Sequence, residues 1–155
     1  MAPFIKGLDL SRAFFEEAVQ PILNKHYPDL VYTAGLIGSG SEILGYDTEM
    51  SSDHHWGPRV MLFLTSGDLS AYADTISRLL SEELPYTFRG YSTHFGDPIY
   101  GDGDNGTQLL EKISDGLINH RVEIMTMDDF MGWYLGIHPQ HQMTPADWLS
   151  IPQQK

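Results

Sequence analysis

The residues best suited to chemistry gather in one stretch of the chain, 38–59. It begins with a Gly-Ser-Gly-Ser turn, ends at Arg59, and holds four carboxylates and two histidines. The backbone amides of such a turn can hold a phosphate. Carboxylates farther along can hold divalent ions that bridge to the same phosphates. With Arg59 beside them, these residue types predict transfer chemistry on a nucleoside triphosphate.

The glycine turn matches neither of the two common phosphate-binding fingerprints. No Gly-Lys-Ser/Thr follows it, as a Walker loop requires, and the third glycine of a dinucleotide-binding motif is missing. Taken alone, the turn could be a plain flexible connection. The functional interpretation is favoured by Asp53, which follows Ser41 after eleven residues and stands just before a predicted strand.

Three apolar segments are predicted to be the strands that position this stretch. Residues 30–37 are partly β-branched and directly precede the glycine turn, while residues 59–65 close the stretch. The second of these runs is apolar on both faces, which indicates a central place in the sheet. A third strand is predicted at 121–126, where Glu123 alternates with apolar neighbours.

Helices are predicted between these strands. Apolar residues recur at helical spacing over 9–26 and 68–84. Pro21 lies inside the first helix and should divide it, and Ser66 or Asp68 should cap the second. Helices that alternate with strands predict an α/β or α+β fold, with a small central mixed sheet flanked by helices.

The pattern is weaker between the second helix and the third strand. Residues 86–95 alternate weakly, as in a strand. Residues 98–106 are rich in turn-forming residues and indicate a loop, and residues 107–118 indicate a short helix. After the third strand, the pair Asp128-Asp129 predicts the start of a further short helix that ends at Leu135.

Length and composition exclude several classes of protein. The chain has 155 residues, enough for one domain, and its 9 Lys+Arg against 21 Asp+Glu give a formal charge of −12. It has no cysteine, which excludes disulfides, thiolate nucleophiles and Cys-ligated metals. No apolar run reaches the roughly 20 residues that span a bilayer, and the first residues lack a signal-peptide pattern, so a cytoplasmic protein without membrane contact is expected. The negative charge argues against nucleic acid and favours a partner that is small, cationic or bridged by metal ions.

The order of these features resembles the polymerase-β-like nucleotidyltransferase superfamily, in which a Gly-Ser turn after one strand precedes carboxylates on later strands. The amino-acid sequence of residues 38–59 is similar to that of a little-characterised branch of the superfamily, known as a domain of unknown function. Looser matches lie at 87–95, 121–124 and 147–150. The resemblance therefore covers most of the chain.

The resemblance implies a division of the chain into two parts. Residues 1–135 would form a nucleotidyltransferase-like domain with the mixed sheet described above. Residues 136–155 would be an irregular tail, at the point where longer relatives begin a C-terminal helical region.

The resemblance also implies roles for single residues. Asp53 and Glu123 would be the catalytic carboxylates, with Glu123 assisting the attacking hydroxyl. His55 stands where the superfamily has a second carboxylate, and imidazole suits Mg²⁺ less well than oxygen does. Either Asp47 or Glu49 replaces that carboxylate, or the metal differs, or the site binds without turnover. The implied metal ligands, for Mg²⁺ or Mn²⁺, are Asp53, His55 and Glu123. The implied nucleotide-binding residues are Gly38, Ser39, Gly40, Ser41 and Arg59.

The implied function is metal-dependent transfer of a nucleoside monophosphate from a nucleoside triphosphate to a hydroxyl of a small molecule. The alternative is a catalytically inactive domain of the same fold that binds nucleotide or a protein partner. A third, weaker alternative is a hydrolase that holds a transition metal at His54 and His55.

Each of these residues also has a purely structural interpretation. Residues 53–55 could be only the polar start of a strand, and Glu123 could lie on an exposed strand face. Arg59 could bind a phosphate or could pair with a nearby carboxylate. Trp56 is expected in the core rather than as a platform for a base, and Glu42 and Asp47 could cap or close the loop rather than serve the site.

Overall fold

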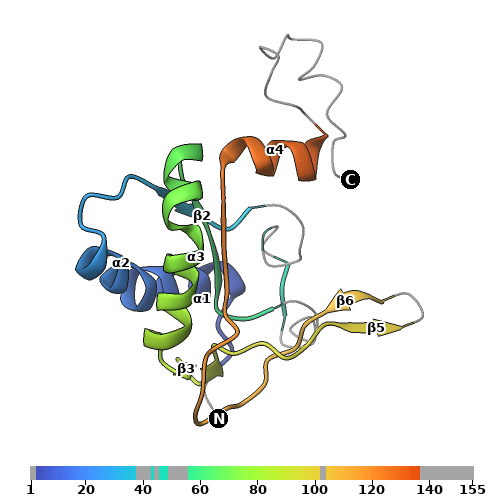
Figure 1. The fold of residues 1–155 in the computed structure, drawn as a ribbon. Helices are drawn as coiled ribbons and strands as arrows, with labels where there is room; N and C mark the ends of the chain where they lie inside the picture. Colours follow the sequence, from blue (N-terminus) through green and yellow to red (C-terminus); the bar gives the residue numbers. More distant parts are fainter. Residues whose placement is uncertain (1–2, 38–42, 44–45, 49–55, 102–103, 137–155) are drawn as a thin grey trace.

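A three-stranded mixed sheet forms the centre of the fold (Figure 1). The computed structural model describes residues 3–37, 43, 46–48, 56–101 and 104–136. The strands are β1 (Thr33–Gly35), β2 (Arg59–Phe63) and β7 (Arg121–Met125), in the order β1-β2-β7. β2 runs antiparallel to β1 and parallel to β7. The strands predicted at 59–65 and 121–126 and the central place of β2 are confirmed. The buried strand predicted at 30–37 is present only as the three residues of β1, and these are not buried. The fold is a mixed α and β fold with a small mixed sheet and flanking helices.

A helical run of three segments precedes the sheet. It consists of α1 (Gly7–Phe14), a π-helical turn (Phe15–Val19) and α2 (Gln20–His26). The expected division at Pro21 is confirmed, because the wider π turn lies immediately before it. Proline lacks an N–H donor and its ring crowds the carbonyl four residues earlier, so the regular hydrogen-bond ladder is interrupted there.

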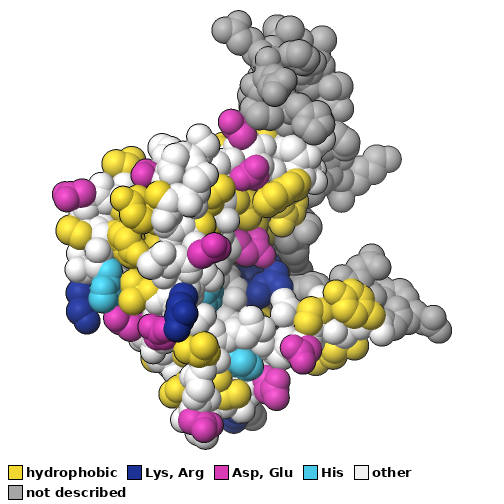
Figure 2. Space-filling model, viewed as in Figure 1, with side chains coloured by type: hydrophobic (Ala, Val, Ile, Leu, Met, Phe, Trp, Pro, Cys, Tyr) yellow, Lys and Arg dark blue, Asp and Glu magenta, His cyan; other side chains and the backbone are white. Residues whose placement is uncertain are grey.

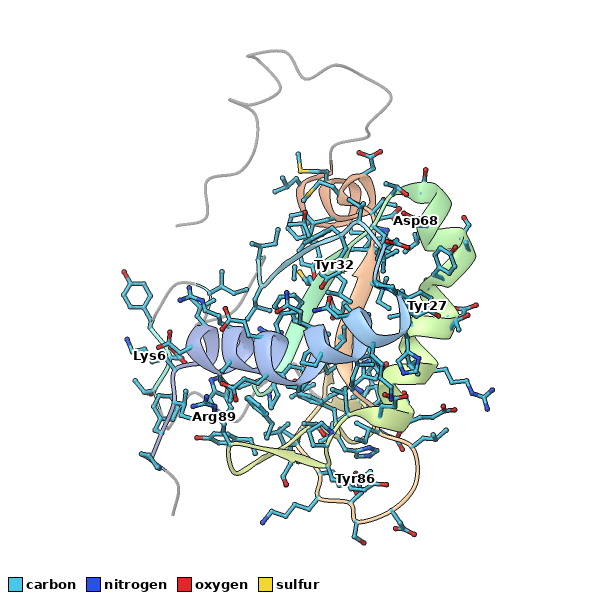
Figure 3. The ribbon with its side chains drawn as sticks, turned by 90° about the vertical axis from the view of Figure 1, so that its left-hand side faces the viewer. Lys6, Tyr27, Tyr32, Asp68, Tyr86 and Arg89 are labelled. Atoms are coloured by element: carbon cyan, nitrogen blue, oxygen red, sulfur yellow. The ribbon has the colours of Figure 1, made fainter. Side chains whose placement is uncertain are left out.

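The second predicted helix is α3 (Ser66–Glu83). It begins at Ser66, one of the two residues expected to precede it as a cap. The prediction of Ser66 or Asp68 as its cap is wrong, because Thr65 has the extended backbone of a cap and its side chain accepts a hydrogen bond from Asp68 N at 3.2 Å. Ser66 is already helical. α3 lies against α2, where the Tyr27 and Tyr72 rings are 5.5 Å apart and His26 contacts Glu83 at 2.7 Å. Figure 3 shows Tyr27 at this junction.

The two faces of the sheet have different partners. Val60, Leu62 and Val122 belong to the large core shared with α1, α2 and α3. The opposite face carries Met61, Phe63 and Met125, which form a small cluster with Phe130 of α4 (Met127–Leu135). Since side chains alternate along a strand, every second residue of β2 and β7 points away from the large core. Arg59, Arg121 and Glu123 lie on that opposite face.

The short helix after the third strand is confirmed as α4, with one change in its cap. The N-cap is Thr126, whose side chain accepts from Asp129 N at 3.0 Å while Asp129 Oδ2 accepts from Thr126 N at 3.1 Å. This reciprocal pair is a capping box. Asp129 of the predicted acidic pair therefore has a capping role, and it acts from the third helical position.

The segment between α3 and β7 differs most from its prediction. The weak strand at 86–95 becomes the small hairpin of β3 (Thr87–Phe88) and β4 (Tyr91–Ser92). The loop expected at 98–106 is instead largely the antiparallel pair β5 (Ile99–Gly101) and β6 (Asp104–Thr107).

The short helix expected at 107–118 is absent, and that prediction is wrong. The chain there is extended and pairs with residues near Phe95. Gly96 N donates to Leu109 O at 2.8 Å, and Glu111 N donates to His94 O at 3.0 Å. These non-local backbone hydrogen bonds replace the local ones of a helix, so tertiary context overrides the helical spacing of the apolar residues.

Two further predictions concern the tail and the possibility of a membrane-spanning helix. The tail at 136–155 lies, apart from Gly136, outside the described residues. In the part of the chain that the structure describes, every helix is too short or too polar to cross a bilayer.

His120 joins α3 to the start of β7. Its Nε2 lies 2.8 Å from Ser77 O and its Nδ1 accepts a hydrogen bond from Val122 N at 3.1 Å. A ring that donates from one nitrogen and accepts at the other is neutral. Burial lowers the pKa of His120 below its ordinary value of 6.5, although the Ser77 hydrogen bond opposes this shift.

We expect His120 to make the fold less stable in mild acid. The unfolded chain takes up the proton near pH 6.5, whereas the folded ring resists it. The stabilisation is therefore complete above pH 6.5 and declines as the pH falls toward the lower pKa of the folded state. Urea unfolding of the wild type and of His120→Asn at several pH values measures this. The wild type should lose free energy of unfolding more steeply than the variant below pH 6.5, and parallel pH profiles would contradict the assignment.

Candidate functional site

The predicted site residues are divided between described and undescribed parts of the chain. Arg59 and Glu123 lie in described strands. The other predicted site residues lie outside the described residues: Gly38, Ser39, Gly40, Ser41, Asp53 and His55. Glu42 and the alternatives Glu49 and His54 lie outside them as well. The described part of the candidate site is therefore the sheet to which the 38–55 segment is attached.

Both ends of this segment are attached at the same end of the sheet. β1 ends at Gly35 and β2 begins at Arg59, and because these strands are antiparallel Gly35 is the register partner of Met61. β7 runs parallel to β2, so it also begins at this end, with Arg121 opposite Arg59. The chain that carries the predicted chemistry thus leaves and rejoins the sheet beside the first residues of β7.

Two guanidinium groups and one carboxylate meet at this end of the sheet. Arg59 and Arg121 are register partners, and Glu123 lies two residues along β7 on the same face. Arg121 Nη2 donates to Glu123 Oε1 at 3.0 Å, and Arg121 Nη1 donates to Gln108 Oε1. The side chains of Arg121 and Glu123 are 23% and 32% exposed, so this pair is neither a free surface pair nor a fully buried one.

The charges of this cluster influence one another. Burial lowers the pKa of Arg59 below its ordinary value, and the neighbouring positive charge of Arg121 lowers it further. The negative charge of Glu123 acts in the opposite direction. Placing like charges directly opposite each other on adjacent strands is unfavourable. An anion that contacts both guanidinium groups would relieve this repulsion.

The surface is hollowed between α4 and the β5–β6 hairpin (Figure 2). Figure 2 shows basic and acidic side chains together on the floor of a hollow between α4 and the β5–β6 hairpin, with hydrophobic side chains on both rims. Exposed apolar side chains of these two elements include Tyr100 of the hairpin and Tyr134 of α4. Charged and apolar side chains therefore lie side by side at this hollow (Figure 2).

Asp47 is held by hydrogen bonds to α1 and to Trp56. Asp47 is buried, and its Oδ2 accepts hydrogen bonds from Gly7 N at 2.5 Å and from Trp56 Nε1 at 3.2 Å. A carboxylate at the first turn of α1 also meets the positive end of the helix dipole. The expected closing role of Asp47 is confirmed, and this oxygen is engaged at α1 rather than at the sheet.

The core position expected for Trp56 is also confirmed. Its ring is buried, stacks on Phe4 at 5.6 Å between centroids, and meets the Tyr91 ring edge-on at 4.8 Å. Trp56 is therefore committed to packing. Its indole N–H donates to Asp47, so Trp56 both packs in the large core and holds the Asp47 side chain.

A cleft of about 430 Å³ lies beside the start of the predicted phosphate turn. It separates α1 from the end of β1, where Gly35 and Leu36 lead toward residue 38. Arg12 and Glu16 line it from the helix, together with the buried Ser11, whose hydroxyl makes no hydrogen bond to any described residue. The cleft provides both charged and apolar surface next to the segment.

Sequence reasoning missed three residues of this site. Arg121 could have been found, because it stands two residues before Glu123 and so shares its strand face. Gln108 and Tyr134 carried no such signal, since Gln108 was assigned to a helix and Tyr134 comes to the site only through the packing of α4.

The fit to a metal ion can be examined at Glu123 alone among the implied ligands. Its carboxylate supplies the hard oxygen that Mg²⁺ prefers, but Arg121 already donates to one of these oxygens. Among the described residues, no three His, Cys, Asp or Glu side chains gather as a metal-binding group would. Comparison of the chain with protein-family models, with curated proteins and with solved structures found no match.

Proposed function

We propose that this protein transfers a nucleoside monophosphate from a nucleoside triphosphate to a hydroxyl of a small molecule. The observation that supports the proposal is the cluster of Arg59, Arg121 and Glu123 at the end of the sheet where the 38–55 segment is attached. Two opposed guanidinium groups suit a polyphosphate, and a carboxylate beside them suits a hydroxyl that must lose its proton.

The reaction follows from this arrangement. The acceptor oxygen attacks the α-phosphorus, a new P–O bond forms, and the bond from the α-phosphorus to the bridging oxygen breaks. Pyrophosphate leaves with that electron pair, and the hydroxyl proton passes to Glu123. Arg59 and Arg121 hold the phosphates and stabilise the charge that develops on them. A divalent ion at Asp53 and Glu123 would supply further positive charge when bound.

A second candidate function is a domain of the same kind that binds nucleotide without turnover. Two observations favour it. Glu123 Oε1 already accepts a hydrogen bond from Arg121 Nη2, so this oxygen is engaged in a structural contact. His55 occupies the position that the superfamily fills with a carboxylate. Such a domain would bind a nucleotide but release no pyrophosphate.

We expect Asp53→Ala to abolish metal-dependent nucleotide binding while the fold remains intact. Calorimetric titration with a non-hydrolysable nucleoside triphosphate, with and without Mg²⁺ or Mn²⁺, measures this. Asp115→Ala, which removes an exposed carboxylate before β7, is the matched control and should bind as the wild type does. Unchanged binding in Asp53→Ala would remove Asp53 from the site, and absence of binding in the wild type would overturn the proposed function.

Pyrophosphate release separates the two candidates. The transferase should release pyrophosphate from a nucleoside triphosphate when small hydroxyl compounds are supplied. The binding domain should be stabilised against thermal unfolding by the same nucleotide and release none.

A further inference from the structure

An aromatic stack leads from the sheet to the surface beside the charged cluster. Phe63 of β2 meets Phe130 of α4 edge-on, with centroids 5.8 Å apart. Phe130 in turn stacks on Tyr134, with centroids 4.7 Å apart and planes inclined by 26°. Phe130 is buried, whereas Tyr134 is 46% exposed. The inner face of the Tyr134 ring is therefore supported, and much of the ring still meets solvent.

The support from Phe130 makes Tyr134 a rigid surface residue. The two residues are four apart on one helix, so their side chains lie one above the other along the same face. A tyrosine packed in this way on one side has less rotational freedom to lose when a ligand binds. A planar group that stacks on it then binds at a smaller entropic cost.

Tyr134 also lies close to the phosphate-binding candidates. Arg59 lies on the same face of β2 as Phe63, where the aromatic stack begins. Tyr134 also acts electrostatically on Arg59, against the lowering of the Arg59 pKa by burial and by Arg121. Figure 2 shows hydrophobic side chains along the α4 rim of the hollow, directly above its charged floor. Anionic and planar parts of one ligand could therefore be held at the same time.

The combination fits a nucleoside polyphosphate better than a simple phosphate. Guanidinium groups such as those of Arg59 and Arg121 can bind phosphates through paired hydrogen bonds. An aromatic ring at the rim offers a face to a base, and such stacking tolerates any base because each has a π face. Trp133 is more exposed than Tyr134, at 69%, but adjacent residues on a helix point in different directions.

We propose that the supported Tyr134 ring is the stacking platform for the nucleobase, next to the Arg59–Arg121 phosphate site. This inference rests on the proposed function and assigns the base-binding part of the same site. It predicts a preference for nucleotides over inorganic polyphosphate, with weak discrimination among the bases, because stacking uses no hydrogen bonds to the base edge.

The test compares two ligands on four proteins by calorimetric titration: a non-hydrolysable nucleoside triphosphate and inorganic tripolyphosphate, each with Mg²⁺. Tyr134→Leu should weaken nucleotide binding roughly tenfold and leave tripolyphosphate binding unchanged. Tyr134→Phe keeps the ring and should bind as the wild type does. Trp133→Leu, which removes the neighbouring, more exposed ring, is the matched control and should also bind normally.

The outcomes separate this inference from the proposed function. If the wild type binds both ligands and Tyr134→Leu binds the nucleotide normally, the stacking role is wrong and the phosphate site stands. An equal loss for both ligands in Tyr134→Leu would show that Tyr134 acts through Arg59, which also overturns stacking. If the wild type binds neither ligand, the proposed function fails and the inference with it. Circular dichroism of each variant checks that the fold is retained.

Discussion

Glu123→Gln should lower the rate of pyrophosphate release by about 10²- to 10⁴-fold, the usual contribution of a general base. The amide keeps the shape of the side chain and can still accept the hydrogen bond that Arg121 donates at 3.0 Å. It cannot accept a proton from the acceptor hydroxyl. Binding of the nucleoside triphosphate should change far less than turnover, because the guanidinium groups of Arg59 and Arg121 remain in place.

Two comparisons make this result specific. Asp115→Asn removes a similar charge from an exposed position before β7 and should leave turnover unchanged, which controls for the loss of one negative charge. The dependence of the rate on pH supplies the second readout, since loss of a base should remove the rise in rate with pH. Equal turnover in Glu123→Gln and the wild type would assign Glu123 to the Arg121 pair alone.

The sheet was predictable because its signal is local. Residues 59–65 are apolar on both faces and residues 121–126 alternate, and both became neighbouring strands, β2 and β7. The period of two also determines that Glu123 and Arg121 share a face, so part of the site could be derived from spacing alone. The parallel pairing that places Arg121 opposite Arg59 could not, because register depends on contacts between distant segments.

The wrong predictions concern features that depend on distant parts of the chain. Residues 107–118 have apolar residues at helical spacing, yet their backbone pairs with His94 and Gly96. Nothing within the segment reports the presence of that partner. In the same way the anchoring of Asp47 depends on Gly7, which is 40 residues away in the sequence. A helix cap also depends on the backbone conformation of a single residue. Sequence patterns do not resolve this, so Ser66 was predicted as the cap and Thr65 was missed.

The fold positions the candidate site through fixed points around the 38–55 segment. Asp47 is tied to α1, Trp56 is buried in the large core, and Arg59 is held in the central strand. Between Trp56 and Arg59 stand only Gly57 and Pro58. The conformation of these two residues therefore sets how the segment enters the sheet beside Arg121.

Gly57→Ala should lower the free energy of unfolding by roughly 3 kcal/mol, from backbone strain and from overpacking. Gly57 has φ +144°, a conformation that side-chain-bearing residues rarely adopt. A Cβ atom there would also lie 2.8 Å from Leu110 Cδ2 and 3.0 Å from Phe95 Cζ. Phe95 is almost fully buried, so it has little room to move.

Gly67→Ala is the control that isolates these two causes. Gly67 lies in the first turn of α3, and a Cβ atom there would meet nothing within 4 Å. Alanine is the better helix former, so this variant should be about 0.5–1 kcal/mol more stable than the wild type. Urea unfolding of both variants measures the free energy of unfolding, which should fall in Gly57→Ala and rise in Gly67→Ala. A Gly57→Ala protein as stable as the wild type would show that residue 57 does not need the glycine conformation. Since Gly57 directs the chain into β2, the destabilised variant should also bind the nucleoside triphosphate more weakly, whereas Gly67→Ala should bind it normally.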